Sequence, residues 1–366
     1  MRFLTMLALV CALILSPALA RAQSLGEMAG QMVMVGFNGT SSDSAGVRAV
    51  REQIAKGQIG GVMYLGTNVE SLSQVRAINA SLGAARPWLP PFIALDQEGG
   101  QIERLKRSVG FTEIPSAEAL AGQGVEAARS AYGQLALDLA AQGFNVYFGP
   151  VVDLDINPSN PIIGRYQRAY GADPATVSAF ARAFVESHHA AGVATALKHF
   201  PGHGSSEGDT HDGFVDITQS WDEVELEPYR ELMGEGLADM VMVAHLFNAE
   251  VQQGDTAQLP ASLSPDWIGG VLRGDLGYGG VVISDDLEMG AIRTRFDLQD
   301  TVVRAVQAGN DILLFSNTAA YDADLGRTIR DILVARAEAD PGFAQRVEQS
   351  YGRIIALKRR MGIVPS

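Results

Sequence analysis

The sequence predicts one α/β domain folded as a single (β/α)8 TIM-type barrel. Eight short apolar runs recur along its 366 residues. Most of them are continuously apolar, which is typical of parallel strands buried on both faces. Eight such strands, each followed by a helical pattern, match the barrel with a few insertions. A doubly wound open sheet is the alternative, but neither Gly60-Gly61 nor Gly99-Gly100 forms the glycine-rich phosphate loop that it needs.

The predicted elements follow in chain order. Ser24 and Glu27 form a possible capping box for a first short helix. The predicted strands are residues 32–37, 61–65, 92–95, 146–152, 194–199, 240–245, 280–284 and 311–315. Three predicted helices, residues 125–142, 174–191 and 298–308, stop at Gly143, Gly192 and Gly309, where a left-handed cap is expected.

Residues 1–22 have the pattern of a cleaved signal peptide. Arg2 supplies the positive start, an apolar stretch follows, and Ala20-Arg21-Ala22 offers a small-x-small cleavage site. The apolar stretch is too short for a stable membrane anchor. We therefore expect an exported protein, in a bacterial periplasm, with no membrane anchor after cleavage. Residues 23–366 would form the barrel domain, since no linker or second domain is visible.

Composition narrows the possible partners. The formal net charge of −14 argues against nucleic acid and anionic membrane surfaces, because both need a basic footprint. The only cysteine, Cys11, lies within the signal peptide. The mature chain would then contain no disulfide and no thiolate metal site.

Polar side chains follow the predicted strands where a barrel carries its active site. These strand ends are Asp96, Asp153, Lys198-His199, His245, Asp285-Asp286 and Asn317. Asp285 is reserved for chemistry, whereas Asp286 or Glu288 is expected to cap the next helix. Asp96 and Arg104 suit a sugar, because carboxylate and guanidinium hydrogen-bond to hydroxyl groups. A simple ion pair that stiffens the loop remains the alternative for these two.

The loop at residues 198–212 contains three of the six histidines of the chain. His199, His203 and His211 permit a metal site, but the His-x-His of metal-dependent barrel hydrolases is absent from residues 32–37. In the second interpretation, Asp209 orients His211 as a general acid/base. Outside the loop, His245 is expected to be packed and hydrogen-bonded. His188 and His189 are expected to be partly exposed on a helix.

Four segments resemble the family 3 glycoside hydrolases, and most of all their single-domain bacterial β-N-acetylglucosaminidases. They are residues 96–100 (DQEGG), 198–204 (KHFPGHG), 209–211 (DTH) and 284–289 (SDDLEM). The resemblance implies a retaining exo-β-N-acetylglucosaminidase, a β-N-acetylhexosaminidase without cofactor that acts on terminal β-linked GlcNAc of a glycan or cell-wall fragment.

The same resemblance assigns roles to residues. Asp285 would be the nucleophile that forms a covalent glycosyl-enzyme, and His211, oriented by Asp209, would be the acid/base. The sugar would be held by Asp96, Arg104, Arg168, Lys198 and His199, and His203 would only shape its loop. A β-glucosidase or β-xylosidase of the same family, a metal-dependent hydrolase and a non-catalytic glycan-binding barrel are the alternatives.

Overall fold

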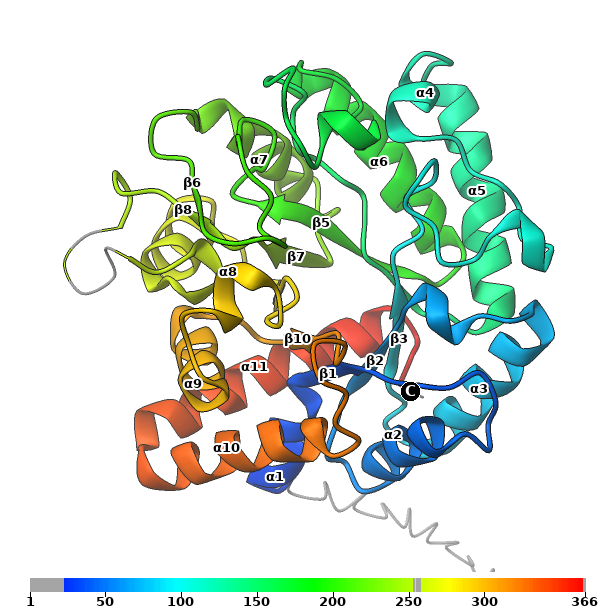
Figure 1. Ribbon diagram of the computed structural model, residues 1–366, viewed down its shortest axis with the longest axis vertical. Coiled ribbons are helices and arrows are strands. Elements are labelled where there is room, and N and C mark those ends of the chain that lie inside the picture. The colour runs from blue at the N-terminus through cyan, green and yellow to red at the C-terminus, as the bar shows by residue number, and fades with distance from the viewer. Residues whose placement is uncertain (1–22, 253, 255–257, 365–366) are drawn as a thin grey trace, which may run out of the picture.

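Eight parallel strands surround a common axis, and helices cover them on the outside (Figure 1). The structure is a computed structural model that describes residues 23–252, 254 and 258–364. The signal-peptide prediction and Cys11 concern residues 1–22 and lie outside the described residues. The strands are β1 (Val33–Gly36), β2 (Gly61–Tyr64), β3 (Phe92–Leu95), β4 (Val146–Tyr147), β5 (Ala194–Phe200), β7 (Met240–Val243), β9 (Val281–Ser284) and β10 (Leu313–Phe315).

The sheet closes on itself. Its order is β10-β1-β2-β3-β4-β5-β7-β9, and a parallel bridge between Ile283 and Ile312 joins the two ends of that order. Every residue of these eight strands is buried, as expected for a barrel wall that faces a packed interior on one side and helices on the other. The predicted (β/α)8 barrel is therefore confirmed, and the open doubly wound sheet is wrong.

The outer layer is helical. Its members are α1 (Leu25–Gln31), α2 (Ala45–Ala55), α3 (Leu72–Ala84), α4 (Ala117–Ala121), α5 (Val125–Gln142), α6 (Pro174–Ala190), α7 (Glu227–Gly234), α8 (Gly290–Arg293), α9 (Leu298–Ala308), α10 (Leu325–Ala339) and α11 (Pro341–Arg360). Between β7 and β9 the chain forms a π-helical segment, Asp266–Asp275. No helix within the described ranges is long and apolar enough to cross a membrane.

The predicted helix ends are accurate to within one residue, since α6 ends at Ala190 and not at the predicted residue 191. Ser24 and Glu27 form the predicted capping box of α1. The helices α5 and α9 have the predicted bounds and end at Gly143 and Gly309, which both adopt positive φ. A residue without a side chain tolerates this backbone conformation at low cost.

Two predictions need correction. The fourth strand is regular only at residues 146–147, not through residues 146–152. Beyond it, the N–H groups of Ala196 and Lys198 still donate to the carbonyls of Gly149 and Pro150, at 2.9 and 3.2 Å, and a bridge joins Val151 to Lys198. Pro150 has no N–H of its own to donate, which interrupts the regular ladder. His188 is not partly exposed: it is fully buried in α6, where it stacks on Phe184 at a ring-centroid distance of 4.1 Å.

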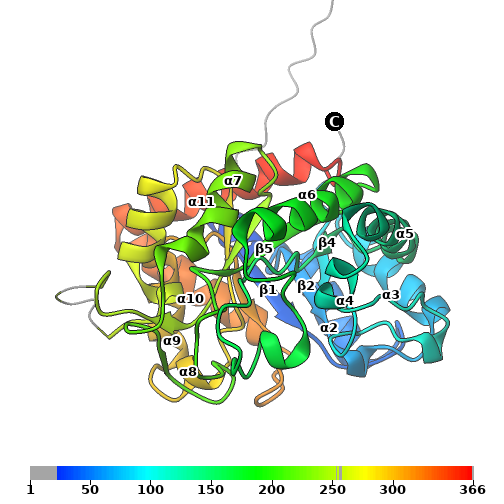
Figure 2. The same cartoon turned by 90° about the horizontal axis from the view of Figure 1, so that it is seen from above.

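A second sheet of two short strands lies beside the barrel. β6 (Val215–Asp216) follows the loop that contains His211, and it pairs in parallel with β8 (Leu246–Phe247), which follows β7. Figure 2 shows α8 among the loops at the lower side of the barrel and α11 near its upper side. The loops after the barrel strands therefore gather at one end, and the C-terminal helix covers the other.

Candidate active site

A cavity of about 510 Å³ opens at the carboxyl ends of the barrel strands. All eight site residues predicted from the sequence line it. They are Asp96, Arg104, Arg168, Lys198, His199, Asp209, His211 and Asp285. These residues come from loops that are far apart in the chain, and barrel closure brings them together. The structure therefore confirms their convergence, while their chemical roles remain predictions.

Asp285 follows β9 directly and faces this cavity. Its backbone N–H donates to the Val243 carbonyl at 2.9 Å, and its Oδ1 accepts the N–H of Asp286 at 2.8 Å. Burial alone would raise the pKa of Asp285, but the nearby His245, His199 and His211 outweigh it and hold the pKa below its ordinary value. Asp285 is thus a carboxylate, ready to act as a nucleophile near neutral pH.

Asp286 and Glu288 do not cap the next helix. The N-cap of α8 is Met289, which has no side-chain oxygen. Asp286 Oδ1 instead accepts the N–H groups of Glu288 and Ser316, at 3.1 and 2.9 Å. Burial raises the pKa of Asp286. The capping prediction was wrong because the Asp286 carboxylate hydrogen-bonds to Ser316, in the loop that follows β10, and not to the first turn of α8.

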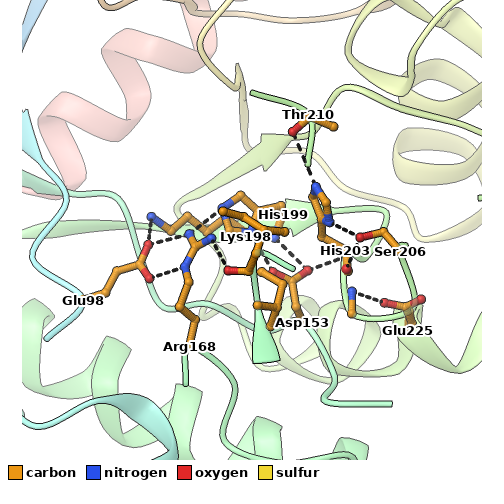
Figure 3. A network of polar contacts seen from close by, with 12 residues as sticks. Glu98, Asp153, Arg168, Lys198, His199, His203, Ser206, Thr210 and Glu225 are labelled. Carbon is orange, nitrogen blue, oxygen red and sulfur yellow. Dashed lines mark hydrogen bonds and ion pairs between the residues drawn. The ribbon is translucent and has the colours of Figure 1, made fainter. Parts of the chain in front are cut away.

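A network of charged side chains also lines the cavity. Lys198 Nζ lies 2.7 Å from Asp96 Oδ1 and 2.6 Å from Glu98 Oε1. Arg168 binds both oxygens of Glu98, at 2.7 and 2.8 Å, and Arg104 reaches Asp96 at 3.2 Å. Figure 3 shows Glu98 facing Arg168 and Lys198 together. Three cations and two carboxylates thus surround a site rich in donors and acceptors for sugar hydroxyl groups.

The charges in this network stabilise one another. Although burial disfavours ionisation of Glu98, Arg168 and Lys198 hold its pKa well below the usual range. Burial likewise tends to lower the pKa of Lys198, but Asp96 and Glu98 raise it overall. Sequence reasoning missed Glu98; the signal available was its place two residues after a strand-end aspartate. Arg168 is the buried arginine, whereas Arg165 is exposed and lies over Tyr166.

His199 is held in a single orientation. Its Nδ1 lies 2.6 Å from Asp153 Oδ2, and its Nε2 lies 3.1 Å from Arg168 Nη2. Because a guanidinium can only donate, Nε2 of His199 accepts a hydrogen bond from Arg168. Nδ1 therefore carries the ring proton and donates a hydrogen bond to Asp153. Burial would raise the pKa of Asp153, but His199 and His203 lower it. Asp153 therefore orients His199 toward the cavity.

The Asp209–His211 pair lines the same cavity from a separate loop. Asp209 Oδ1 accepts the His211 backbone N–H at 2.9 Å and its Nδ1–H at 2.7 Å. The His211 side chain is 61% exposed and that of Asp209 is 23% exposed. Among the described residues no group hydrogen-bonds to Nε2 of His211. That nitrogen is therefore available to give or take a proton.

The remaining strand-end histidines have structural partners. His203 is buried, and its N–H donates to Asp153 Oδ1 at 2.8 Å; burial lowers its pKa to about 4. His245 lies 2.8 Å from the Asp286 carbonyl and 2.7 Å from Ser262 Oγ, as expected for a packed histidine. In residues 23–252, 254 and 258–364, no three His, Cys, Asp or Glu side chains are grouped to hold a metal ion.

Comparison with known proteins gives a consistent result. The sequence model described as "Glycosyl hydrolase family 3 N terminal domain" matches residues 24–357. "Beta-hexosaminidase A" of Pseudoalteromonas piscicida is 32% identical, over 92% of this chain and 61% of its own length. "Beta-hexosaminidase" of Pseudomonas aeruginosa is 34% identical, over 74% of this chain and 79% of its own.

Solved structures agree. A β-N-acetylglucosaminidase of glycoside hydrolase family 3 from Paenibacillus superposes with a TM-score of 0.84 at 35% identity, covering 94% of this chain and 64% of that one. A β-N-acetylhexosaminidase from Beutenbergia cavernae has a TM-score of 0.81 at 28% identity, covering 92% and 99%. The chain thus spans less than two thirds of the Pseudoalteromonas and Paenibacillus proteins and nearly all of the Beutenbergia protein.

Proposed function

Because this chain belongs to glycosyl hydrolase family 3, we propose that it is a retaining exo-β-N-acetylglucosaminidase acting on terminal β-linked GlcNAc. One observation carries the proposal. Asp285 faces a cavity of about 510 Å³, and the Asp209–His211 pair faces the same cavity from a separate loop. A retaining glycosidase needs these two groups, a carboxylate nucleophile and an independent proton donor.

In the first half of the reaction, an oxygen of Asp285 attacks the anomeric carbon of the sugar. The bond from that carbon to the glycosidic oxygen breaks, and His211 Nε2–H gives its proton to the departing oxygen. The carboxylate of Asp209, 2.7 Å from Nδ1, stabilises the protonated imidazole before the transfer. The product of this step is a glycosyl ester on Asp285.

In the second half, His211 Nε2 takes a proton from water, and the water oxygen attacks the anomeric carbon. The ester bond breaks, and Asp285 is regenerated as a carboxylate. Asp96, Arg104, Arg168, Lys198 and His199 would hold the sugar hydroxyl groups during both halves. Ion pairs among these residues and with Glu98 and Asp153 fix them before substrate arrives, which avoids reorganisation during the reaction.

The sugar preference is tested on purified protein with aryl glycosides of N-acetylglucosamine, glucose and xylose. The N-acetylglucosaminide should have the highest kcat/KM. A higher value for the glucoside or xyloside would replace the proposed substrate with that sugar while leaving the enzyme class unchanged. Absence of turnover on all three, with sugar binding retained, would favour a non-catalytic barrel.

The mechanism is tested by trapping the intermediate. A fluorinated glycosyl inactivator should leave its label on Asp285, identified by mass spectrometry of the digested protein. His211→Ala should lose activity on substrates with poor leaving groups and retain it on dinitrophenyl glycosides, which leave without a proton. A label on another residue would move the nucleophile, and uniform loss across leaving groups would remove the acid role from His211.

We also propose that the protein is exported and that residues 1–22 are removed, on the strength of the Arg2 start and the Ala-Arg-Ala cleavage pattern. Expression of the full chain in a Gram-negative host tests this. The protein in the periplasmic fraction should begin at Gln23. Recovery of the uncleaved chain in the cytosol would contradict export.

A further inference from the structure

We propose that Gly290 positions the acid/base loop: because it has no side chain, the backbone at His211 and Asp212 can dock against the turn that carries Asp285. This inference rests on the proposed function and concerns a residue that touches no substrate. The Gly290 N–H donates to the His211 carbonyl at 3.1 Å, and the Ala291 N–H donates to the Thr210 carbonyl at 3.2 Å. Two successive carbonyls of the loop are thus fixed by two successive amides.

The fit at this contact leaves no room for a methyl group. A Cβ at Gly290 would lie 2.6 Å from the His211 carbonyl oxygen and 2.9 Å from both the carbonyl carbon and the oxygen of Asp212. All three atoms are backbone, so no side chain can rotate away. Gly290 is not among the glycines with positive φ. Close approach of the loop, and not backbone conformation, is therefore what requires glycine here.

The loop has a second support on its inner side. Thr210 is buried, and its Oγ1 lies 3.5 Å from His203 Nε2, a long contact. Figure 3 shows Thr210 at the end of the network that runs through Asp153 and His203. The neighbouring His211 side chain is largely exposed. The hydrogen bonds donated by the N–H groups of Gly290 and Ala291 are therefore shorter than the contact between Thr210 and His203.

Gly290 belongs to the same short turn as the nucleophile. Within that turn, Leu287 N–H donates to the Leu314 carbonyl at 2.9 Å, and Met289 N–H donates to the Asp286 carbonyl at 3.0 Å. The carboxylate of Asp286 adds a bond to Ser316 N–H. The turn is thus rigid from Asp285 to Gly290. Docking the loop on it fixes His211 relative to Asp285, and the two groups must act on opposite ends of one breaking bond.

The test is Gly290→Ala, read with two substrates. kcat/KM reports the first half of the reaction, in which His211 donates its proton. For chitobiose, whose leaving group needs that proton, kcat/KM should fall on the order of 10²-fold. For the dinitrophenyl glycoside it should stay close to that of the unmodified protein. The thermal midpoint should fall only slightly, because the exposed backbone at His211 and Asp212 can move away from the added methyl group while the barrel core stays packed.

Two further variants keep the test decisive. Gly133→Ala is the matched control: Gly133 lies inside α5, and a Cβ there would meet nothing within 4 Å, so both substrates should be unaffected. In the His211→Ala background, Gly290→Ala should add no further loss, because residues that act through one group are non-additive. Equal losses on both substrates, or additive losses in the double variant, would overturn the inference.

The failure of this inference can be distinguished from failure of the proposed function. The activity loss in His211→Ala could depend on the leaving group while that in Gly290→Ala does not. In that case His211 remains the proposed acid/base, and the positioning role of Gly290 is wrong. If His211→Ala lacks the dependence, the acid/base assignment itself is wrong, whatever the glycine variant does.

Discussion

Two aspartates at opposite ends of neighbouring strands have opposite environments. Asp311 precedes β10 and is fully buried; its oxygens accept from Arg273, Val282 N–H, Ser350 and Arg353 at 2.7 to 3.0 Å. Asp285 follows β9, and among the described residues only the N–H of Asp286 hydrogen-bonds to its carboxylate. A carboxylate saturated by four donors fastens helices to the barrel. One that keeps an oxygen toward a cavity can form a bond to substrate.

Two buried lysines repeat the contrast. Lys198 meets two carboxylates at the active-site end, and they raise its pKa. Lys358 lies in α11 at the other end. Among the described residues, its amine contacts only neutral oxygens of Gln31, Gly60 and Pro90 and the ring of Phe92. Burial lowers its pKa to about 7. Burial thus lowers the pKa of a lysine surrounded by neutral groups, whereas neighbouring carboxylates reverse that effect.

The largest expected effects separate the two aspartates. Asp285→Asn should lower kcat by at least about 10⁴-fold with only a small loss of stability, because among the described residues a single backbone N–H hydrogen-bonds to its carboxylate. Asp311→Asn should lower the free energy of unfolding by about 3–5 kcal/mol, since it removes a fully buried charge that pairs with two partly buried arginines. Turnover and urea unfolding, measured on both variants, check this. Comparable losses of unfolding free energy in the Asp285 and Asp311 variants would contradict the proposed difference between the two aspartates.

The next effect concerns the charge network. Glu98→Gln should lower kcat/KM by roughly 10²-fold, because Lys198 and Arg168 lose the carboxylate that aligns them and small displacements of positioning groups are costly. The loss should be similar for good and poor leaving groups, since proton transfer is untouched. Glu113→Gln, which removes an exposed carboxylate near Arg107, is the control. A leaving-group-dependent loss would place Glu98 in proton transfer instead.

A smaller effect is expected in the pH dependence of stability at the active-site end. Burial raises the pKa of Glu225 from 4.5 to about 8, although Ser205 and the Gly204 N–H donate to it. The folded state therefore keeps a proton that the unfolded chain releases, and this stabilisation is lost as pH rises from about 4.5 through 8. Glu225→Gln should flatten that slope in urea unfolding, whereas Glu223→Gln, exposed on the same segment, should not. Parallel slopes for Glu225→Gln and unmodified protein would contradict it.

The smallest expected effect has the opposite sign and lies at the other end. Lys358 is protonated in the unfolded chain up to its ordinary pKa of 10.5 but only to about 7 when folded. Its contribution to stability is present at high pH and is lost as pH falls from about 10.5 through 7. As the pH rises from about 7 to 10.5, the free energy of unfolding of the unmodified protein should increase relative to that of Lys358→Met. Turnover should be the same in both proteins. A constant difference across the range would show that Gln31, Pro90 and Phe92 keep the amine charged.

Much of the fold could be predicted because local patterns determine it. Apolar runs mark strands buried on both faces, and glycines such as Gly143 mark helix ends. Boundaries failed where a single residue changed the hydrogen bonding, as at Pro150. His188 was misjudged because helical spacing alone does not tell which face of α6 packs against the barrel.

The site was predictable in part. Strand-end rules place Asp285 and Asp96 at one end of the barrel, and the structure confirms that all eight residues converge there. Glu98 and Asp153 act by orienting other side chains, and such partnerships depend on distances across the barrel that no local pattern contains. The docking of the His211 loop on Gly290 is of the same kind, because it joins segments 79 positions apart only once the barrel has closed.

The pairing of β1 with β10 has a consequence for biosynthesis. Val33 in β1 pairs with Leu313 in β10, which lies 280 positions later in the chain. Until that strand and α11 have left the ribosome, the growing chain has an unpaired sheet edge and an uncovered apolar end. The barrel can therefore close only after both strands have been made, and β1 remains unpaired on this side while the intervening residues are synthesised.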